Sequence, residues 1–472
     1  MKIIGREEEI RSLRYLATSS KPEFAVVYGR RRVGKTYLVK AFFHDRFAFY
    51  ATGLLKGKQR DQLKNFRSFL LKCGHSKKSV PTDWFDAFDR LQELLESDAA
   101  FRQPDSGKRV VFLDEAPWMD GKRSNFKQAL DRFWNSWGST QEDLLLIVCG
   151  SATSWIIKNF MKDEGGFYNR LTEKIHLTPF SLGECERYAS HANLSLSKKQ
   201  IMELFMVFGG IPYYWSLLRR GESPAQSVER LCFKEGGTLW DEFGLLFKSL
   251  FTAKGPHRRI VEAMAKKNEG VFRTDLVDSG ITDGKPLTDA LEELEQCGFV
   301  RGYKNATKKQ RGICYQLIDP FSRFALAFLQ EKSVGSWPSY YGTPSYDTWS
   351  GNAFELLCLN NIASIKAALG ISGVLTNESA WRSEKSKPGA QIDLLIERRD
   401  GIIDVCEMKY SAARYSISEE YEENLRNKLS AFRNETKTRA ALHLTMIVSN
   451  GLNRNEHSDI VVNVITGEDL FR

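Results

Sequence analysis

The sequence predicts an α/β chain divided into several domains, the first of which is expected to contain a parallel β-sheet. Three runs of consecutive apolar residues, at 24–28, 110–113 and 144–149, support this prediction. Because such strands are apolar on both faces, they are expected to be covered on both sides, as in parallel sheets. Glycine or aspartate follows each run, at the end of the strands where open α/β sheets bind ligands. The length of 472 residues leaves room for roughly three domains.

The composition is that of an ordinary globular chain. Apolar residues make up 42% and charged residues 27%, which argues against a disordered or collagen-like protein. The net charge of +9 is compatible with a polyanionic partner. No Cys-x-x-Cys pair occurs among the eight cysteines, so zinc-ribbon and thioredoxin-like sites are not expected. No stretch resembles a signal peptide or a membrane span, so we expect a cytoplasmic protein with reduced thiols and no membrane association.

The first apolar run leads into a phosphate-binding motif. Residues 29–36 match the P-loop pattern and read Gly29, Arg30, Arg31, Arg32, Val33, Gly34, Lys35 and Thr36. The glycines let the backbone turn tightly, so that peptide N–H groups point at phosphate oxygens. Lys35 is expected to reach the β- and γ-phosphates of ATP, and the hydroxyl group of Thr36 is expected to bind Mg²⁺. A glycine-rich turn that binds no ligand is the alternative.

Polar residues at the ends of later strands extend this candidate site. Asp114 ends the second apolar run and can hold Mg²⁺ through its water shell, and Glu115 can polarise the attacking water. Ser151 follows the third run and is a candidate for sensing the γ-phosphate or orienting water, with a strand-ending turn as the alternative. Arg170 is a candidate γ-phosphate contact, including one made to a neighbouring subunit, with a surface arginine as the alternative.

The middle of the chain is predicted to be helical and then to form a compact unit. Apolar positions recur at helical spacing over residues 181–252. Within residues 253–332, three helices are expected at 257–265, 273–279 and 286–297, followed by strands at 298–303 and 313–318. Three helices and a β-hairpin form the winged-helix plan.

The predicted hairpin has a basic tip. The stretch 301–311 contains no acidic residue and contains Arg301, Lys304, Lys308, Lys309 and Arg311. Such a tip can lie along a phosphate backbone, whereas the acidic third helix disfavours insertion into a groove. The alternative is that the module packs between domains and that the tip is merely solvated.

A cluster of acidic residues with a lysine is predicted near the C-terminus. Strand-like runs are expected at 391–397, 402–408 and 442–448, after a helix near 353–368. Asp393 and Glu407 lie on the first two runs and can share a divalent metal ion, and Lys409 has the same strand parity as Glu407. Glu355 on the preceding helix completes a set of hard oxygen ligands that suits Mg²⁺ or Mn²⁺.

This acidic cluster resembles the core of PD-(D/E)xK nucleases. By that resemblance Asp393, Glu407 and Glu355 bind the metal ion, and Lys409 positions or activates the attacking water. Asp404 has the opposite strand parity and is left outside the site. The alternative is a degenerate nuclease fold that binds DNA or subunits without cutting.

Further motifs together resemble the prokaryotic, archaeal-type ATPases of the STAND/AAA+ group. They lie at residues 5–9, 28–36, 113–115, 149–151, 169–170 and 208–214. The resemblance implies an α/β P-loop ATPase core with a parallel sheet at 1–180, a helical lid at 181–252 and a winged helix at 253–332. A linker at 333–345 and an α/β restriction-nuclease-like domain at 346–472 complete the implied architecture. The resemblance also implies that Arg6 lies near the nucleotide base and that Ser151 occupies the sensor-1 position.

Two hypotheses for the function follow. In the first, ATP binding and hydrolysis control DNA binding and metal-dependent phosphodiester cleavage at the C-terminal site. In the second, the protein is a nucleotide-dependent assembly or signalling switch, and its nuclease-like domain is a non-catalytic binding module. DNA and a homo-oligomer driven by nucleotide are the expected partners, and ATP with Mg²⁺ the expected cofactors.

Overall fold

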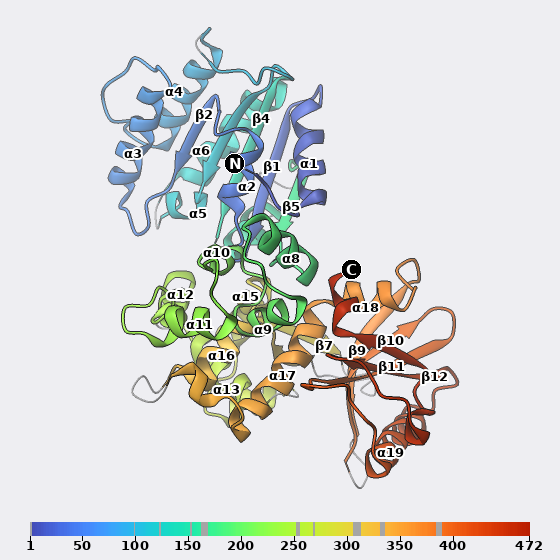
Figure 1. Cartoon of the computed structure of the whole chain (residues 1–472). Coiled ribbons are helices and arrows are strands. Elements are labelled where there is room, and N and C mark those ends of the chain that lie inside the picture. Colours follow the sequence, from blue (N-terminus) through green and yellow to red (C-terminus); the bar gives the residue numbers. More distant parts are fainter. Residues whose placement is uncertain are drawn as a thin grey trace. The chain divides into compact units, whose positions relative to one another are not determined.

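The computed structural model describes the chain except for residues 1, 99, 122–123, 152, 162–168, 252–254, 268–269, 305–312, 331–335 and 384–388. It divides the chain into two compact units, Met1–Pro179 and Phe180–Arg472 (Figure 1). All the modules that the sequence predicts after residue 180 lie in the second unit.

The first unit is built on a five-stranded parallel sheet. The strand order is β2 (Phe49–Thr52), β3 (Arg109–Asp114), β4 (Leu144–Gly150), β1 (Glu23–Gly29) and β5 (Glu173–Leu177). The three predicted strands are β1, β3 and β4, and their near-complete burial explains their consecutive apolar residues. The sequence did not predict the edge strands β2 and β5, because their buried positions alternate with partly or fully exposed ones.

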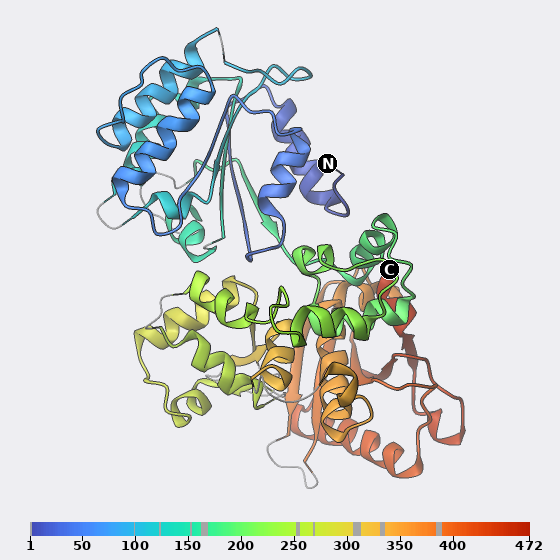
Figure 2. The same ribbon diagram turned by 60° about the vertical axis from the view of Figure 1, so that its left-hand side comes forward.

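Helices cover both faces of this sheet, with α3 and α4 on one side and α1 on the other (Figure 2). Phe66 of α3, Trp84 of α4 and Phe126 of α6 belong to one buried core with Phe24 and Val111 of the sheet. The helices of this unit are α1 (Glu7–Thr18), α2 (Lys35–Phe42), α3 (Gln59–Lys72), α4 (Trp84–Glu96), α5 (Ala116–Met119), α6 (Phe126–Ser136), η1 (Gly138–Thr140), α7 (Thr153–Ile156) and η2 (Ile157–Met161).

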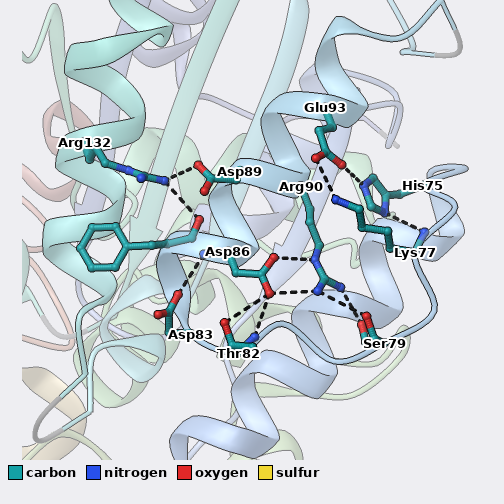
Figure 3. Close-up of polar contacts among 11 residues, drawn as sticks. His75, Lys77, Ser79, Thr82, Asp83, Asp86, Asp89, Arg90, Glu93 and Arg132 are labelled. Atoms are coloured by element: carbon teal, nitrogen blue, oxygen red, sulfur yellow. Dashed lines mark hydrogen bonds and ion pairs between the residues drawn. The ribbon is translucent and has the colours of Figure 1, made fainter.

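A buried arginine on α4 holds the connection between α3 and α4 (Figure 3). Arg90 is 5% exposed, and its Nε and Nη2 atoms donate to the two carboxylate oxygens of Asp86 at 2.8 and 2.9 Å. Its Nη1 atom donates to the carbonyl oxygen of Ser79 at 2.6 Å. Arg132 of α6 contacts Asp89 on another side of α4, where both side chains are about half exposed.

The second unit begins with a helical segment. Its helices are α8 (Leu182–His191), α9 (Lys198–Phe208), α10 (Pro212–Ser216), α11 (Pro224–Val228), η3 (Glu229–Phe233) and α12 (Glu242–Leu250). Capping boxes at Ser181, Ser197 and Ser223 fix where three of them begin, since each serine accepts a hydrogen bond from a backbone N–H group of the first turn. None of the helices in the described ranges has the length and apolar character needed to cross a bilayer.

Three helices and a small antiparallel sheet follow. They are α13 (His257–Ala265), β6 (Val271–Phe272), α14 (Arg273–Asp278), α15 (Lys285–Gln296), β7 (Val300–Lys304) and β8 (Ile313–Leu317), with strand order β6-β8-β7. The sequence predicted the three helices and the hairpin, but not the two-residue strand β6. Apolar residues of all three helices and both hairpin strands form one core, which includes Ile260, Leu276, Leu291 and Phe299.

The structure describes only the beginning of the basic stretch of this hairpin, and the predicted tip lies outside the described residues. Arg301 is partly buried on β7, which packs against β9 of the C-terminal sheet. Burial lowers the pKa of Arg301, and the nearby charge of Glu378 on β9 opposes that shift. Lys308, Lys309 and Arg311 lie outside the described residues. Arg301 therefore faces a protein neighbour rather than solvent.

The expected linker at 333–345 is structured in its described part. Residues Trp337–Tyr340 form the short helix η4, and α17 already begins at Pro344. Trp337 is 2% exposed, and its ring lies 5.1 Å from that of Phe324 on α16 (Pro320–Phe328) and 5.6 Å from that of Trp349. Aromatic side chains gain most from burial, which explains why this stretch packs against its neighbours.

The single helix expected near 353–368 is two helices, α17 (Pro344–Asn360) and α18 (Ile362–Ala368). Asn361 breaks them with φ −126°. Its amide group donates to the carbonyl oxygen of Leu357 at 2.8 Å and accepts from the N–H group of Leu182 at 3.0 Å. The break therefore ties α17 to the start of α8.

A mixed five-stranded sheet forms the C-terminal part, in the order β13-β12-β11-β10-β9. Its elements are β9 (Thr376–Arg382), β10 (Gln391–Arg398), β11 (Ile402–Lys409), α19 (Glu419–Thr436), β12 (Ala441–Val448), η5 (Glu456–Ser458), β13 (Asn463–Thr466) and η6 (Gly467–Phe471). The pairs β9–β10 and β10–β11 are antiparallel, and β11–β12 and β12–β13 are parallel. Helix α19 makes the crossover that a parallel β11–β12 pair requires.

We predict that Arg90→Met loosens the connection between α3 and α4. The substitution leaves the carboxylate of Asp86 and the carbonyl oxygen of Ser79 without their buried donor, at a cost of about 1–3 kcal/mol. Amide hydrogen exchange over residues 73–86 is expected to become faster. Arg132→Met is the matched control, because the exposed ion pair with Asp89 contributes little to stability. Equal rates of amide hydrogen exchange over residues 73–86 in the two variants would contradict the assigned role of Arg90.

Candidate functional site

The P-loop of the first unit is shaped by its two glycines. Gly29 has φ 137°, and a Cβ atom there would lie 2.2 Å from the carbonyl oxygen of Leu177 on β5. Gly34 has φ 93° and precedes α2, whose first residue is Lys35. The Lys35 ammonium group donates to the carbonyl oxygens of Gly29 at 2.8 Å and Arg30 at 2.9 Å. The loop therefore curves around this ammonium group, as a phosphate-binding loop does.

A hydroxyl group and a carboxylate meet beside this loop. Thr36 donates to Asp114 at the end of β3, with its hydroxyl oxygen 3.0 Å from each carboxylate oxygen. Burial raises the pKa of Asp114, and the nearby charge of Glu115 raises it further. Two hard oxygen donors at this spacing beside a phosphate-binding loop fit a Mg²⁺ ion that is shared with nucleotide phosphates.

Glu115 and Ser151 form a second pair at the same edge of the sheet. Ser151 is 4% exposed, and its hydroxyl and N–H groups donate to one carboxylate oxygen of Glu115 at 2.8 and 3.1 Å. The backbone of Glu115 has φ 47°, a left-handed conformation that is uncommon for residues other than glycine. Such conformations cluster at functional sites, because the surrounding structure must hold them in place. Ser151 thus positions the carboxylate that the sequence singled out as the candidate base.

The predicted arginines differ in their surroundings. Arg6 is 5% exposed and donates to the carbonyl oxygen of Val33 in the P-loop at 3.3 Å. Within the loop, Arg30 is buried and Arg32 has φ 73°, while Arg31 is partly buried. Arg170 is exposed, and its guanidinium group donates to the side chain of Asn135 on α6. The structure therefore places Arg6 at the P-loop and Arg170 on a surface contact.

The second unit brings the predicted acidic residues near one another. Leu394 of β10 pairs with Cys406 of the antiparallel strand β11. Asp393 precedes Leu394 and Glu407 follows Cys406, so the two acidic residues lie opposite each other and their side chains share one face of the sheet. Burial first, and then the charges of Asp393 and Glu407, raise the pKa of Glu355 on α17 to about 8. Burial also raises the pKa of Asp393, with Glu407 as the next contributor.

Glu407 is held ionised by Lys409, which the sequence singled out, and by two neighbours on α19 that it did not. Burial opposes its ionisation, but Lys428 and Lys409 outweigh this effect and lower its pKa. The hydroxyl group of Tyr421 donates to one carboxylate oxygen of Glu407 at 2.6 Å, and Lys428 Nζ lies 2.7 Å from the other. Lys409 Nζ lies 3.3 Å from Glu407 Oε1 and over the ring of Tyr421. Tyr421 and Lys428 are seven residues apart on α19, and this spacing was the available indication that both face the sheet.

The acidic residues are not arranged as a metal centre. Over the residues that the structure describes, no three His, Cys, Asp or Glu side chains converge as metal ligands do. The predicted set of Glu355, Asp393 and Glu407 therefore shares an electrostatic environment without forming a ligand cage. The physical reason is that both oxygens of Glu407 are engaged by α19.

A small cavity of about 140 Å³ borders Asp393. Its walls come from β9 and β10 and from the module with α14, β7 and β8, and include Trp381, Arg382, Asp275 and Tyr303. Gln391 donates to Asp393 at 2.7 Å beside it. This space is smaller than the ~300 Å³ at which small-molecule sites begin, so in this arrangement Asp393 is not open to a nucleotide-sized group.

Asp404 lies on the opposite face of β11, as its strand parity predicted. It is fully buried, and Arg398 Nη1 lies 3.6 Å from its carboxylate. Thr445 and Asn463 also donate to it at 3.4 Å each. These contacts connect β11 with β12 and β13 and keep Asp404 apart from the acidic cluster.

We predict that Glu355→Gln reduces the pH dependence of stability. Because the folded-state pKa of about 8 exceeds the ordinary glutamate value of 4.5, the stability from protonated Glu355 is present at low pH. It is lost as the pH rises toward 8, and glutamine cannot ionise. We expect the fall in unfolding free energy between pH 5 and pH 8 to shrink by about 1–3 kcal/mol, allowing for partial solvation.

Urea denaturation of the full chain in EDTA measures this difference. Glu423→Gln, which removes an exposed carboxylate from α19, is the matched control and is expected to leave the pH dependence unchanged. An unaltered fall in the Glu355→Gln variant would show that Glu355 ionises normally in the folded protein.

Comparisons with known proteins cover the first unit and part of the second. Residues 3–218 match a family model described as an ATPase domain found predominantly in Archaea. An uncharacterized protein of Methanocaldococcus jannaschii is 23% identical over 328 residues, which cover 69% of this chain and 68% of that protein.

Solved structures give a similar result. The Walker-type ATPase of Pyrococcus abyssi has a TM-score of 0.50 at 22% identity, covering 69% of this chain and 96% of that one. The ORC2 protein of Aeropyrum pernix, in its ADPNP and ADP complexes, has a TM-score of 0.42 at 15% identity and covers 69% and 93% of the two chains. The similarity to the Pyrococcus abyssi ATPase shows a shared fold. The family model shows which residues of the chain match, namely 3–218. Residues 3–218 are thus similar to an archaeal-type ATPase domain.

Proposed function

We propose that this protein hydrolyses ATP and that its nucleotide state controls DNA binding and metal-dependent phosphodiester cleavage by the second unit. The convergence of Lys35, the Thr36–Asp114 pair and the Glu115–Ser151 pair at the ends of β1, β3 and β4 carries the first half of this proposal. Open parallel sheets bind their ligands at this edge.

Each residue has a distinct task in ATP hydrolysis. Peptide N–H groups of the P-loop and the Lys35 ammonium group bind the phosphates, and Thr36 with Asp114 would hold Mg²⁺. When bound, Mg²⁺ neutralises the charge that develops on the phosphate oxygens. Glu115 accepts a hydrogen bond from the attacking water and orients it toward the γ-phosphate. Ser151 keeps one Glu115 oxygen fixed, which leaves the other to face the water.

The order of elements in the C-terminal part supports the nuclease half of the proposal. A helix with Glu355 precedes three antiparallel strands that bear Asp393, Glu407 and Lys409, and a helix and a parallel strand follow. This is the arrangement expected of a PD-(D/E)xK domain. Glu355, Asp393 and Glu407 would hold Mg²⁺ or Mn²⁺ once Lys428 gives up its contact with Glu407, and Lys409 would position the attacking water. Three helices and a β-hairpin over residues 257–317 are consistent with a winged helix that contacts DNA.

A second candidate function is favoured by the contacts of Glu407. Tyr421 and Lys428 occupy both of its carboxylate oxygens, and the cluster is not arranged as a metal site. In this alternative the C-terminal sheet is a binding module, and the protein is a switch that assembles with ATP. Light scattering with a non-hydrolysable ATP analogue separates the two, since a nucleotide-driven increase in mass without any cleavage favours the switch.

We predict that Glu115→Gln lowers ATP turnover by about 10²-fold or more while ATP binding is retained, because the amide cannot polarise water. Ser151→Ala is expected to lower turnover less, by roughly 10-fold, since it frees the carboxylate without removing it. Steady-state phosphate release and equilibrium binding of a fluorescent ATP analogue measure the two effects. Normal turnover in the Glu115→Gln variant would exclude Glu115 as the base.

We predict that Asp393→Asn lowers DNA cleavage by about 10²-fold or more with ATP turnover unchanged. The assay combines Mg²⁺ or Mn²⁺, with and without ATP, with single-stranded, duplex and circular DNA. Asp400→Asn is the matched control, because Asp400 lies in the turn between β10 and β11 and pairs with Arg398. If the unsubstituted protein cuts none of these substrates, the cleavage proposal fails and the binding module remains.

A further inference from the structure

A positively charged stretch of the first unit has no part in the candidate ATP site. Residues 56–78, which include α3, contain eight lysines and arginines and one acidic residue, Asp61. Four of these cations are exposed and follow one another closely along the chain, and we call them the basic surface: Lys56, Lys58, Arg60 and Lys64. Like charge gathered on one exposed segment attracts a polyanionic partner.

The cations of the basic surface are not used in ion pairs. None of the four has a carboxylate partner within the part of the chain that the structure describes. The neighbouring helix α4 is acidic, but three of its carboxylates are engaged by other cations, in the ion pairs Asp86–Arg90, Asp89–Arg132 and Glu93–Lys77 (Figure 3). The charge of the basic surface is therefore left for a partner.

The loop that bears Lys56 and Lys58 is held in one conformation by Gln62 of α3. Gln62 is 2% exposed, and its amide oxygen accepts from the N–H group of Leu54 at 2.9 Å. Its amide nitrogen donates to the carbonyl oxygens of Leu54 at 2.7 Å and Trp118 at 2.8 Å. Lys56 has φ 58°, a left-handed conformation that is uncommon for residues other than glycine. A loop that is already ordered loses less conformational freedom when a partner binds.

Arg60 and Lys64 continue the basic surface along α3. They are four residues apart, so their side chains lie one above the other on one side of the helix. Leu63 and Phe66 of the same helix belong to the buried core of the first unit. The helix therefore packs on the sheet through its apolar side and presents Arg60 and Lys64 to solvent.

Two exposed leucines lie beside these charges. Leu54 is 36% exposed and Leu55 is 49% exposed, and both directly precede Lys56. A nucleic-acid strand offers apolar sugar and base surfaces next to its phosphates, and apolar side chains of DNA-binding proteins contact such surfaces. The combination of unpaired cations and exposed leucines thus matches the chemistry of a nucleic acid.

The loop starts next to the candidate ATP site. The N–H group of Gly53 donates to the carbonyl oxygen of Asp114 at 2.9 Å. A Cβ atom at Gly53 would lie 2.5 Å from the carbonyl oxygen of Glu115, so the loop packs directly on the strand end that bears both carboxylates. Gln62 adds its hydrogen bond to Trp118, three residues after Glu115. A nucleotide-driven shift at Glu115 would therefore reach the basic surface through backbone contacts.

We propose that the basic surface binds the sugar–phosphate backbone of DNA, with Leu54 and Leu55 against its sugars or bases. The backbone belongs either to a duplex or to a single strand. DNA as the partner rests on the proposed function, whereas the surface requires neither ATP hydrolysis nor cleavage. A row of phosphates can engage several cations at once, and each contact releases condensed counterions. An acidic protein segment lacks such a condensed ion atmosphere, which makes salt dependence the decisive readout.

Binding is measured with the full chain in EDTA, so that no cleavage occurs. Fluorescence anisotropy follows a labelled duplex and a labelled single strand of the same sequence over a range of salt concentrations. The loop variant carries Lys56→Gln and Lys58→Gln, and the helix variant carries Arg60→Gln and Lys64→Gln. Each variant is expected to bind DNA about 10-fold or more weakly, whatever the sequence of the probe.

The slope of log affinity against log salt should fall by roughly 0.9 for each lost phosphate contact with duplex DNA and by roughly 0.7 with a single strand. A purely structural role of these residues would not produce this change. The probe that binds more tightly to the unsubstituted protein and displaces the other identifies the form of DNA.

A matched control removes two charges from another helix of the same unit. Arg11 and Arg14 are exposed on α1, which covers the opposite face of the sheet (Figure 2). The variant with Arg11→Gln and Arg14→Gln has the same net charge as the other two variants and is expected to bind DNA normally. A loss as large in this control would overturn the proposal, because the attraction would then be non-specific.

Unchanged affinity and salt slope for both probes in the loop and helix variants would also overturn the proposal. Absence of DNA binding by the unsubstituted protein would do the same and would leave an acidic protein segment as the partner. Variant-sensitive binding that a non-hydrolysable ATP analogue does not alter, without cleavage in the separate nuclease assay, leaves the DNA surface standing and removes only the proposed control by nucleotide and the nuclease function.

Discussion

The close approach of β1 to β5 is the constraint on which the candidate ATP site depends. Gly29 pairs with Leu177, and only a residue without a Cβ atom fits against the Leu177 carbonyl oxygen. This contact fixes the point where β1 ends and the P-loop begins. The loop then brings Lys35 back over its own carbonyl oxygens and presents Thr36 to Asp114. A larger residue at position 29 would separate the strands and displace each of these groups together.

Both candidate sites keep carboxylates in surroundings that resist their ionisation, and each does so in a different way. Burial and the charge of Glu115 raise the pKa of Asp114, and the neutral hydroxyl group of Thr36 only partly opposes this shift, so a bound cation would stabilise the carboxylate. In the second unit the carboxylates differ from one another. Two lysines favour the charged form of Glu407, while burial and that charge favour the protonated form of Glu355. Pairs of groups whose pKa values are driven apart are typical of acid–base chemistry.

In the sheet of the first unit, the sequence predicted the strands that are buried on both faces and missed those that are half exposed. β1, β3 and β4 were evident from consecutive apolar residues, whereas β2 and β5 have alternating patterns over four or five residues. The helix break at Asn361 was missed because its contact with Leu182 joins residues that are 179 apart in the sequence. The prediction of a linker was wrong because a short Ser-, Pro- and Tyr-rich stretch has the composition of a loop. The packing of its aromatic residues against distant parts of the chain is not visible in the local sequence.

The candidate site residues divide in the same way: local sequence patterns predict some of them, and only long-range packing brings the others together. Lys35, Thr36, Asp114 and Glu115 are given by motifs and strand ends, which are local features. Tyr421 and Lys428 were missed, because only the packing of α19 on the sheet brings them to Glu407. Their presence changes the expected chemistry of the acidic cluster. A carboxylate that is already neutralised by an ammonium group has less need of a metal ion, so metal binding at Glu407 requires Lys428 to give up its contact. Under the proposed function, the competition between this lysine and a divalent cation would therefore separate a nuclease from a binding module.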